Sequence, residues 1–378
     1  MRRLVPGAFL LGLAVLSSCG HSNRVNAPFV PTLVALFNNF DWVQGKYFLL
    51  YDPNLGPAYD IDPTSVRVYL DGGDYNYGVN SIRVKAMLDP DGLRHMPLSA
   101  GQDTLAVRGN FDLLVAGTDY VLLHDRFVFH DTVYTVLRLR SPIPSFSNAA
   151  LAVSYRAAEI IGPGHALGTP FTVGGRVLTA PGRDSGAVLL QLVRVPRDRQ
   201  PRTPDLQHFD EATGLGPVRE LELKNIYSLG AFDFDPATVS LTVREGQDDP
   251  PVTTRSGVPL LEMLGLDGWD ERGATPVRGH DGRLDGTGST RTELGTLDAA
   301  RGELMLPDAR PFAPRVDASH PFDAALAARA NRRLRFGASG VPEPGAAETY
   351  ELANPLPRDA HWFFDVKVPL PAGTRPRS

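Results

Sequence analysis

Two segments of the chain, 173 residues apart, carry the same short pattern, and this internal repeat constrains the fold more than any other feature. Residues 59–70 read YDIDPTSVRVYL, and residues 232–243 read FDFDPATVSLTV. In both segments Asp-Pro precedes an alternation of apolar and polar residues, which is typical of a half-buried β-strand. Asp can close a side-chain turn while Pro restricts the backbone torsion φ, so the strand starts at a defined place. The repeat therefore predicts two related β domains in tandem.

The composition and the remaining apolar runs favour an all-β fold with minor helix, built as two β-sandwich-like domains. The chain of 378 residues contains 37 Gly and 33 Pro, which interrupt helices and favour turns. Residues 195–205 contain three prolines and predict a linker, so we expect domain 1 over residues 46–205 and domain 2 over residues 206–370. Further strands are expected at 82–84, 127–129, 133–139, 151–155, 188–195 and 362–368.

Several local details can be predicted from the same patterns. The turn residues 71–74 (DGGD) predict a hairpin between the strands on either side. The strand at 127–129 is the expected counterpart, in the repeat, of residues 304–306. A short helix is expected at 259–264, and a longer one near 320–336, where apolar residues recur every fourth position. Its arginines, Arg329, Arg332 and Arg333, are expected to face solvent.

The N-terminus has the features of an exported lipoprotein. Arg2 and Arg3 precede an apolar stretch at residues 4–16, which is shorter than the roughly 20 residues that span a bilayer and is typical of a signal peptide. Leu16-Ser17-Ser18-Cys19 then matches a lipobox, so we predict a signal peptide over residues 1–19 and lipidation of Cys19. An ordinary signal peptide with an incidental cysteine is the alternative. Residues 20–45 are predicted to be a tether that ends in an entry strand, and residues 371–378 a tail.

The sequence contains none of the motifs that mark common enzymes or cofactor sites. Zinc-protease, hydrolase, phosphate-loop and dinucleotide-binding patterns are absent, and a net charge of -5 argues against a nucleic-acid partner. His124 and His130 bracket a short strand without a third ligand nearby. Asp281 and Asp285 flank Gly282 and hint at a calcium loop, but the EF-hand spacing is not met, so solvated acidic residues are expected in 267–285. We therefore predict no enzyme, cofactor or metal site.

A series of ordered segments resembles one known family. The segment LKNIYSLGA at 223–231 continues into the second repeat, and further matches lie at 259–267, 281–285 and 302–312. In the first half the matching segments are 59–70, 117–120 and 151–155. Together they resemble the SprA/Sov family, the outer-membrane translocons of type IX secretion and gliding motility. At roughly ten residues per strand, the family's large barrel needs about 360 residues. That is nearly the whole length of this chain, most of which is already assigned to the two repeats. The resemblance therefore implies the family's repeat module without that barrel.

The resemblance implies a function as well as a fold. We expect a non-enzymatic lipoprotein, held by its lipid anchor at the bacterial outer membrane or cell surface after export. Its partners would be outer-membrane secretion or envelope proteins, in type IX-like protein secretion or gliding motility, and exposed strand edges would bind them. The alternative is a β-sandwich surface lipoprotein that binds polysaccharide or another envelope ligand. For that alternative Trp269 and Trp362 are the candidate aromatic contacts, with core packing as the competing interpretation of both.

Overall fold

The structure of the chain is a computed structural model. The described residues are 32–39, 41–51, 59–72, 81–92, 106–129, 132–145, 147–161, 166–196, 221–247, 249–255, 257–270, 272, 277–285, 297–306, 333–334, 349–350 and 362–370. The all-β class with minor helix is confirmed: the described elements are strands, two 3-10 turns and one short α-helix. Cys19, the signal peptide over residues 1–19 and the tail over residues 371–378 lie outside the described residues.

The first half of the chain forms two sheets. The larger sheet contains β3 (Tyr59–Ile61), β4 (Arg67–Asp71), β5 (Ser81–Met87), β6 (Val107–Leu113), β9 (Ala150–Ile161), β10 (Ala166–Leu167), β11 (Phe171–Val173), β12 (Arg176–Val177) and β13 (Val188–Arg194). The smaller sheet has the order β2-β8-β7 and consists of β2 (Tyr47–Leu49), β8 (Thr132–Leu139) and β7 (Tyr120–Phe129).

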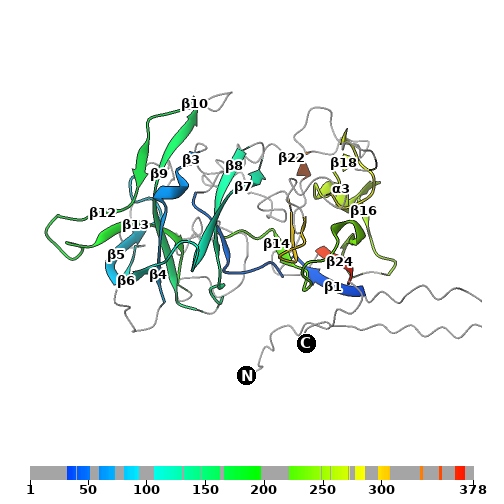
Figure 1. Cartoon of the computed structure of the whole chain (residues 1–378), viewed down its shortest axis with the longest axis horizontal. Helices are drawn as coiled ribbons and strands as arrows, with labels where there is room; N and C mark the ends of the chain where they lie inside the picture. The colour runs from blue at the N-terminus through cyan, green and yellow to red at the C-terminus, as the bar shows by residue number, and fades with distance from the viewer. Residues whose placement is uncertain are drawn as a thin grey trace, which may run out of the picture.

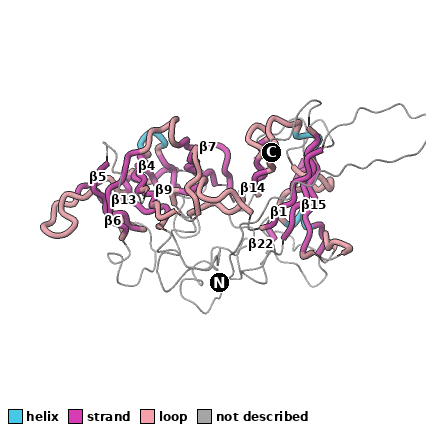
Figure 2. The backbone as a smooth tube through the Cα atoms, turned by 90° about the horizontal axis from the view of Figure 1, so that it is seen from below, coloured by secondary structure: helices cyan, strands magenta, loops and turns pink. Residues whose placement is uncertain are grey.

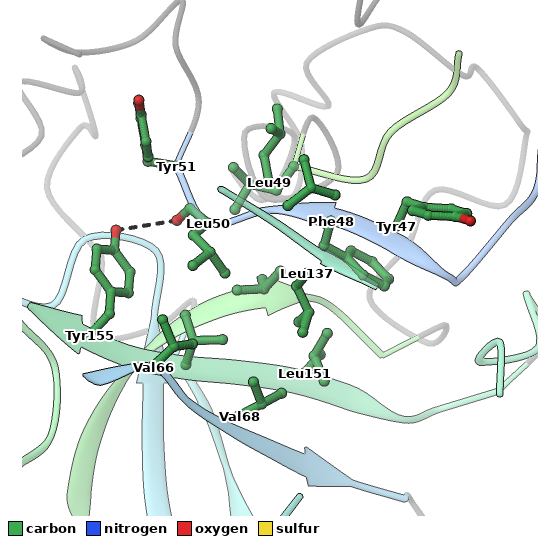
Figure 3. Close-up of a cluster of buried hydrophobic side chains, with 14 of the residues drawn as sticks. Tyr47, Phe48, Leu49, Leu50, Tyr51, Val66, Val68, Leu137, Leu151 and Tyr155 are labelled. Carbon is green, nitrogen blue, oxygen red and sulfur yellow. Dashed lines mark hydrogen bonds between the residues drawn. The ribbon is translucent and has the colours of Figure 1, made fainter. Parts of the chain in front are cut away.

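The larger sheet closes on itself. β9 pairs with β4 along one edge and with β13 along the other, and β6 and β5 complete the path between them. Alternate residues of these strands therefore face inward or outward. The inward side chains form one core around Phe111, Ala152 and Leu190. The outward side chains, such as Val68 and Leu151, pack against β2-β8-β7 in a second core, which Figure 3 shows with the Tyr155 hydroxyl donating to the Leu50 carbonyl (3.3 Å).

The second half is built from two three-stranded sheets around a separate core. One sheet has the order β14-β21-β20 and the other β1-β24-β15. Their strands are β14 (Ile226–Ser228), β21 (Glu303–Met305), β20 (Leu297–Asp298), β1 (Thr32–Asn38), β24 (Trp362–Pro369) and β15 (Ser240–Glu245). The short helix α3 (Leu260–Met263) lies where the sequence predicts it and buries Leu260, Leu261 and Met263. Figures 1 and 2 show the closed sheet and the β1-β24-β15 sheet on opposite sides, with β7 and β14 between them.

The remaining described elements are short. They are the pairs β16 (Thr254–Arg255) with β17 (Val258–Pro259), β18 (Trp269–Asp270) with β19 (Val277–Arg278), and β22 (Arg333–Leu334) with β23 (Thr349–Tyr350). Arg333 and Leu334 thus lie in a strand, so the helix expected near 320–336 is wrong at its C-terminal end. Their main chains pair with residues 349–350, a distant partner that the local four-residue periodicity does not reveal. Arg329 and Arg332 lie outside the described residues.

The turn that starts each repeat has the predicted chemistry in both halves. Asp62 precedes the 3-10 turn η1 (Pro63–Ser65), and its carboxylate accepts a hydrogen bond from the Thr64 N–H (3.0 Å). Asp235 precedes η3 (Pro236–Thr238), and its carboxylate accepts from the Ala237 N–H (3.0 Å). In each case the following strand begins two residues after the turn. The interpretation of the Asp-Pro pairs as strand-starting turns is therefore confirmed.

The repeat also extends to sheet topology, with one correction. The order β2-β8-β7 in the first half matches β14-β21-β20 in the second, and the antiparallel pair β4–β9 matches β15–β24. The counterpart of β21 is therefore β8, and the expected match between residues 127–129 and 304–306 is wrong by one strand. The hairpin predicted at residues 71–74 is also wrong, because β6 lies between β4 and β5.

The two halves exchange segments across the expected boundary. The strand expected at the end of the tether is β1, and it pairs antiparallel with β24 of the second half, from Thr32 opposite Pro369. In the other direction, Leu221 and Leu223 are buried in the core of the first half, and the Leu223 N–H donates to the Tyr47 carbonyl (2.9 Å). The core between the closed sheet and β2-β8-β7, and the core of the second half, thus each contain residues from outside the ranges 46–205 and 206–370, whereas the core inside the closed sheet lies within residues 46–205.

Buried polar groups also join the two halves. Glu303 of β21 is 7% exposed, and its carboxylate accepts a hydrogen bond from the Tyr47 hydroxyl (2.5 Å) and forms an ion pair with Lys46 (3.0 Å). Burial raises the pKa of Tyr47 above its usual value, and the Glu303 carboxylate adds to this effect, so the phenol stays protonated as the donor. This arrangement fixes the start of β2 against the second half.

A charged cluster holds the turn after β12 against the closed sheet. The Asp184 carboxylate accepts from Arg108 (2.8 Å) and pairs with Lys85 (3.0 Å). These contacts, Arg108 first, hold the pKa of Asp184 well below its ordinary value. Because the folded pKa is lowered, the stabilisation is present above the unfolded pKa of about 3.9 and lost as the pH falls below it. We expect Asp184→Asn to melt earlier than the wild type at pH 7, with the difference shrinking as the pH falls below about 4 and lost only below the lowered pKa of the folded carboxyl. A difference that stays constant as the pH falls from about 4 would contradict the role of this carboxylate.

Candidate functional site: the free edge of β1

The repeat gives a direct comparison for strand β1. In the first half, β13 pairs with β9, and its far edge is covered by β5, with Val188 opposite Val84. In the second half, β1 holds the equivalent place beside β24, and within the described part of the chain no strand pairs with its far edge. The sheet that closes in the first half is therefore open in the second.

The main chain of β1 presents hydrogen-bonding groups at this open edge. The Asn39 N–H donates to the Trp362 carbonyl of the partner strand (3.0 Å). Because bonding direction alternates along an antiparallel pair, the odd-numbered residues of β1 bond toward β24, and Val34 and Leu36 direct their N–H and C=O groups to the open edge. At the end of the strand, Asp41 accepts from the Asn38 N–H (2.9 Å) and closes this row.

The side chains of β1 are apolar on both faces of the sheet. On the inner face, Phe37 is 4% exposed and stacks on Tyr227 and Phe364, with ring centroids 5.0 and 5.1 Å apart. On the outer face, Val34 and Leu36 are 44% and 56% exposed. Their neighbours on β24 and β15 in the same face are polar, namely Lys367, Asp365, Ser240 and Thr242.

Edge strands are ordinarily protected against further pairing by charges, prolines, bulges or very short length. β1 runs over seven residues, TLVALFN, and contains no charge and no proline. Its register with β24 is continuous from Thr32 to Asn38. These properties make it a candidate surface for an additional strand.

The opposite edge of the same sheet, formed by β15, carries charged residues. β15 ends in Arg244 and Glu245, and Arg244 forms an ion pair with Asp365 (3.2 Å) and lies over the Phe363 ring. The Glu245 N–H, which points away from β24, donates to the Val252 carbonyl (2.8 Å). Of the two edges of this sheet, β1 is therefore the candidate for partner binding.

The other residues singled out in the sequence do not form a site in the described structure. Trp362 is fully buried in the core of the second half, so core packing is confirmed for it and the role of an exposed ligand contact is wrong. For Trp269 and His124 the structure describes the backbone alone, in β18 and β7. His130 lies outside the described residues.

Buried carboxylates in the acidic segment at 267–285 connect two loops by hydrogen bonds. Asp267 and Asp285 are 1% and 3% exposed, so the expectation of solvated acids is wrong for them. The Asp267 carboxylate accepts from the N–H groups of Asp281 (3.0 Å) and Gly282 (2.9 Å), and Asp285 accepts from the Gly268 N–H (2.9 Å). Burial raises the pKa of Asp267 above its ordinary value despite these bonds. Backbone N–H groups thus bind both oxygens of Asp267 and one oxygen of Asp285, one of the two residues that suggested a calcium loop.

No group of three or more His, Cys, Asp or Glu side chains suited to a metal occurs within the described residues. Among the same residues, no helix combines the length and apolar character needed to cross a bilayer. The chain matches no family model and no curated protein.

One feature of the sequence could have indicated the open edge of β1. It is the run VALF, in which the usual alternation with polar residues is missing.

Proposed function

We propose that the protein is a non-enzymatic lipoprotein of the outer membrane or cell surface that binds a protein partner at the free edge of β1. The observation that carries the proposal is the row of open main-chain groups at Val34 and Leu36, flanked by their exposed apolar side chains. In this mode of recognition the partner supplies an extended segment, its main chain provides affinity, and alternate side chains provide specificity.

The proposed context is type IX-like secretion or gliding motility. It is supported by the resemblance of residues 59–70 and 223–243 to the SprA/Sov family and by the lipobox at Cys19. An anchored protein that carries an open strand edge is suited to hold another envelope protein or a client chain. Lipidation of Cys19 would confine both partners to one surface and so raise their effective concentration.

The proposal is tested by a photo-crosslinking amino acid at position 34, in cells of the native organism. We expect illumination to give a covalent adduct with an envelope protein, and Cys19→Ala to reduce that adduct because the chain is no longer anchored. The matched control carries the same amino acid at Thr242, which lies on the same face of the sheet but away from the open edge. Adducts of equal yield at both positions, or none at position 34, would contradict the proposal.

A further inference from the structure

We propose that the strand which pairs with β1 comes from a second copy of this chain, so that two sheets join into one across a twofold axis at Ala35. The inference rests on the proposed function, because it names the partner of the same edge. It is carried by the self-complementarity of β1 in antiparallel orientation, in both its main chain and its side chains.

The main-chain groups match in number and spacing. In an antiparallel pair centred on Ala35, Val34 of one copy lies opposite Leu36 of the other. These residues direct their N–H and C=O groups to the open edge, so each Val34–Leu36 pair exchanges both of its hydrogen bonds. The Asn38 N–H is already bonded to Asp41. The next pair in this register, Asn38 opposite Thr32, is therefore not used, and the self-paired ladder consists of the two Val34–Leu36 pairs.

The side chains match face by face. On the outer face, Val34 and Leu36 of each copy meet Leu36 and Val34 of the other, and four exposed apolar side chains lose contact with water together. On the inner face, Leu33 lies opposite Phe37 and extends the apolar face of the core. Because β1 carries no charge, self-pairing brings no like charges together.

The chain itself shows that this position accepts a strand. β5 covers the equivalent edge of β13 in the first half, with four residue pairs from Val188 to Gln191. The second half has no such strand among the residues that the structure describes. A second copy would complete its sheet, and anchoring both copies in one membrane would favour the pairing by raising their effective concentration.

The register can be tested with two single-cysteine variants in the full chain carrying Cys19→Ser. Val34→Cys and Leu36→Cys both lie on the exposed outer face, where substitution leaves the core intact. Residues opposite each other are about 5.5 Å apart between Cα atoms, which suits a disulfide, whereas identical residues lie on the diagonal at roughly 7–8 Å, which does not. Under mild oxidation we expect a 1:1 mixture of the variants to form at least roughly fivefold more disulfide dimer than either variant alone.

Each outcome separates the two proposals. A preference for the mixture supports self-pairing in this register. Equal yields in all three samples, or no dimer in the mixture, would overturn it. If the dimer is absent while position 34 crosslinks to a different envelope protein, the proposed function stands and self-pairing falls. If position 34 crosslinks in cells to this chain alone and the mixture forms the dimer, self-pairing stands, and the protein partner in the proposed function is a second copy of this chain.

Discussion

Phe37→Ala is expected to lower the free energy of unfolding by about 3–5 kcal/mol, whereas Leu36→Ala should change it by less than roughly 0.5 kcal/mol. The two residues are neighbours on β1, but Phe37 is 4% exposed and Leu36 is 56% exposed. Phe37 stacks on Tyr227 and Phe364, so its truncation leaves a cavity in the core of the second half. The comparison tests whether the N-terminal strand is part of that core.

Chemical denaturation followed by tryptophan fluorescence measures this difference directly. Trp42 and Trp362 are both buried in the core of the second half, so their emission reports on its unfolding. The experiment is done at low protein concentration, so that any pairing at the open edge does not contribute to stability. A loss of equal size in the two variants would show that β1 does not pack with its inner face against Tyr227 and Phe364.

Gly302→Ala is expected to cost at least roughly 3 kcal/mol, because it combines backbone strain with a collision. Gly302 has φ +63, and a Cβ atom there would lie 1.7 Å from the Ala231 carbonyl oxygen. This glycine precedes β21, and its own carbonyl accepts from the Leu229 N–H (2.7 Å). The two chain segments therefore cannot separate without loss of the pairing between β14 and β21.

Gly282→Ala is the matched control for this substitution. Gly282 also has a positive φ, +77, but a Cβ atom there would meet nothing within 4 Å. Its replacement should cost about 1 kcal/mol, the strain of a left-handed backbone alone. Denaturation curves of both variants give the two values. A cost for Gly302→Ala no larger than that of the control would mean that the strands can move apart, and that the close approach is not required.

Part of the fold could be predicted because its causes are local. Asp62 and Asp235 each bind a backbone N–H two residues ahead, so their turns need no distant partner. The alternation of Val66 and Val68 shows which face is buried for the same reason. The near-continuous apolar run at residues 188–195 predicts a strand that is buried on both faces, and β13 is buried from Leu189 to Arg194. Here one face lines the interior of the closed sheet and the other faces outward.

The candidate site depended on contacts that no local pattern encodes. The run VALF indicated a strand, but its pairing with β24, more than 300 residues away in the chain, decided which edge stays open. The sequence predicted solvated carboxylates at Asp267 and Asp285, with Asp285 also a calcium candidate, but backbone N–H groups of the opposing loop bind both carboxylates and both residues are buried. In both cases the sequence contained the apolar or acidic residues, but the strand or backbone groups that they bind lie elsewhere in the chain.

The amino-acid sequence alone determined where strands begin, which of their side chains turn inward, and that the pattern occurs twice. These properties depend on a few neighbouring residues, through turn chemistry and the two-residue period of a strand. Only the tertiary structure decided which strands pair. It decided that the larger sheet of the first half closes, and that β1, from the N-terminal part of the chain, joins the sheet of the second half and leaves one edge open. Pairing is decided by long-range packing, because many strands of one chain have compatible patterns and only the assembled cores select among them.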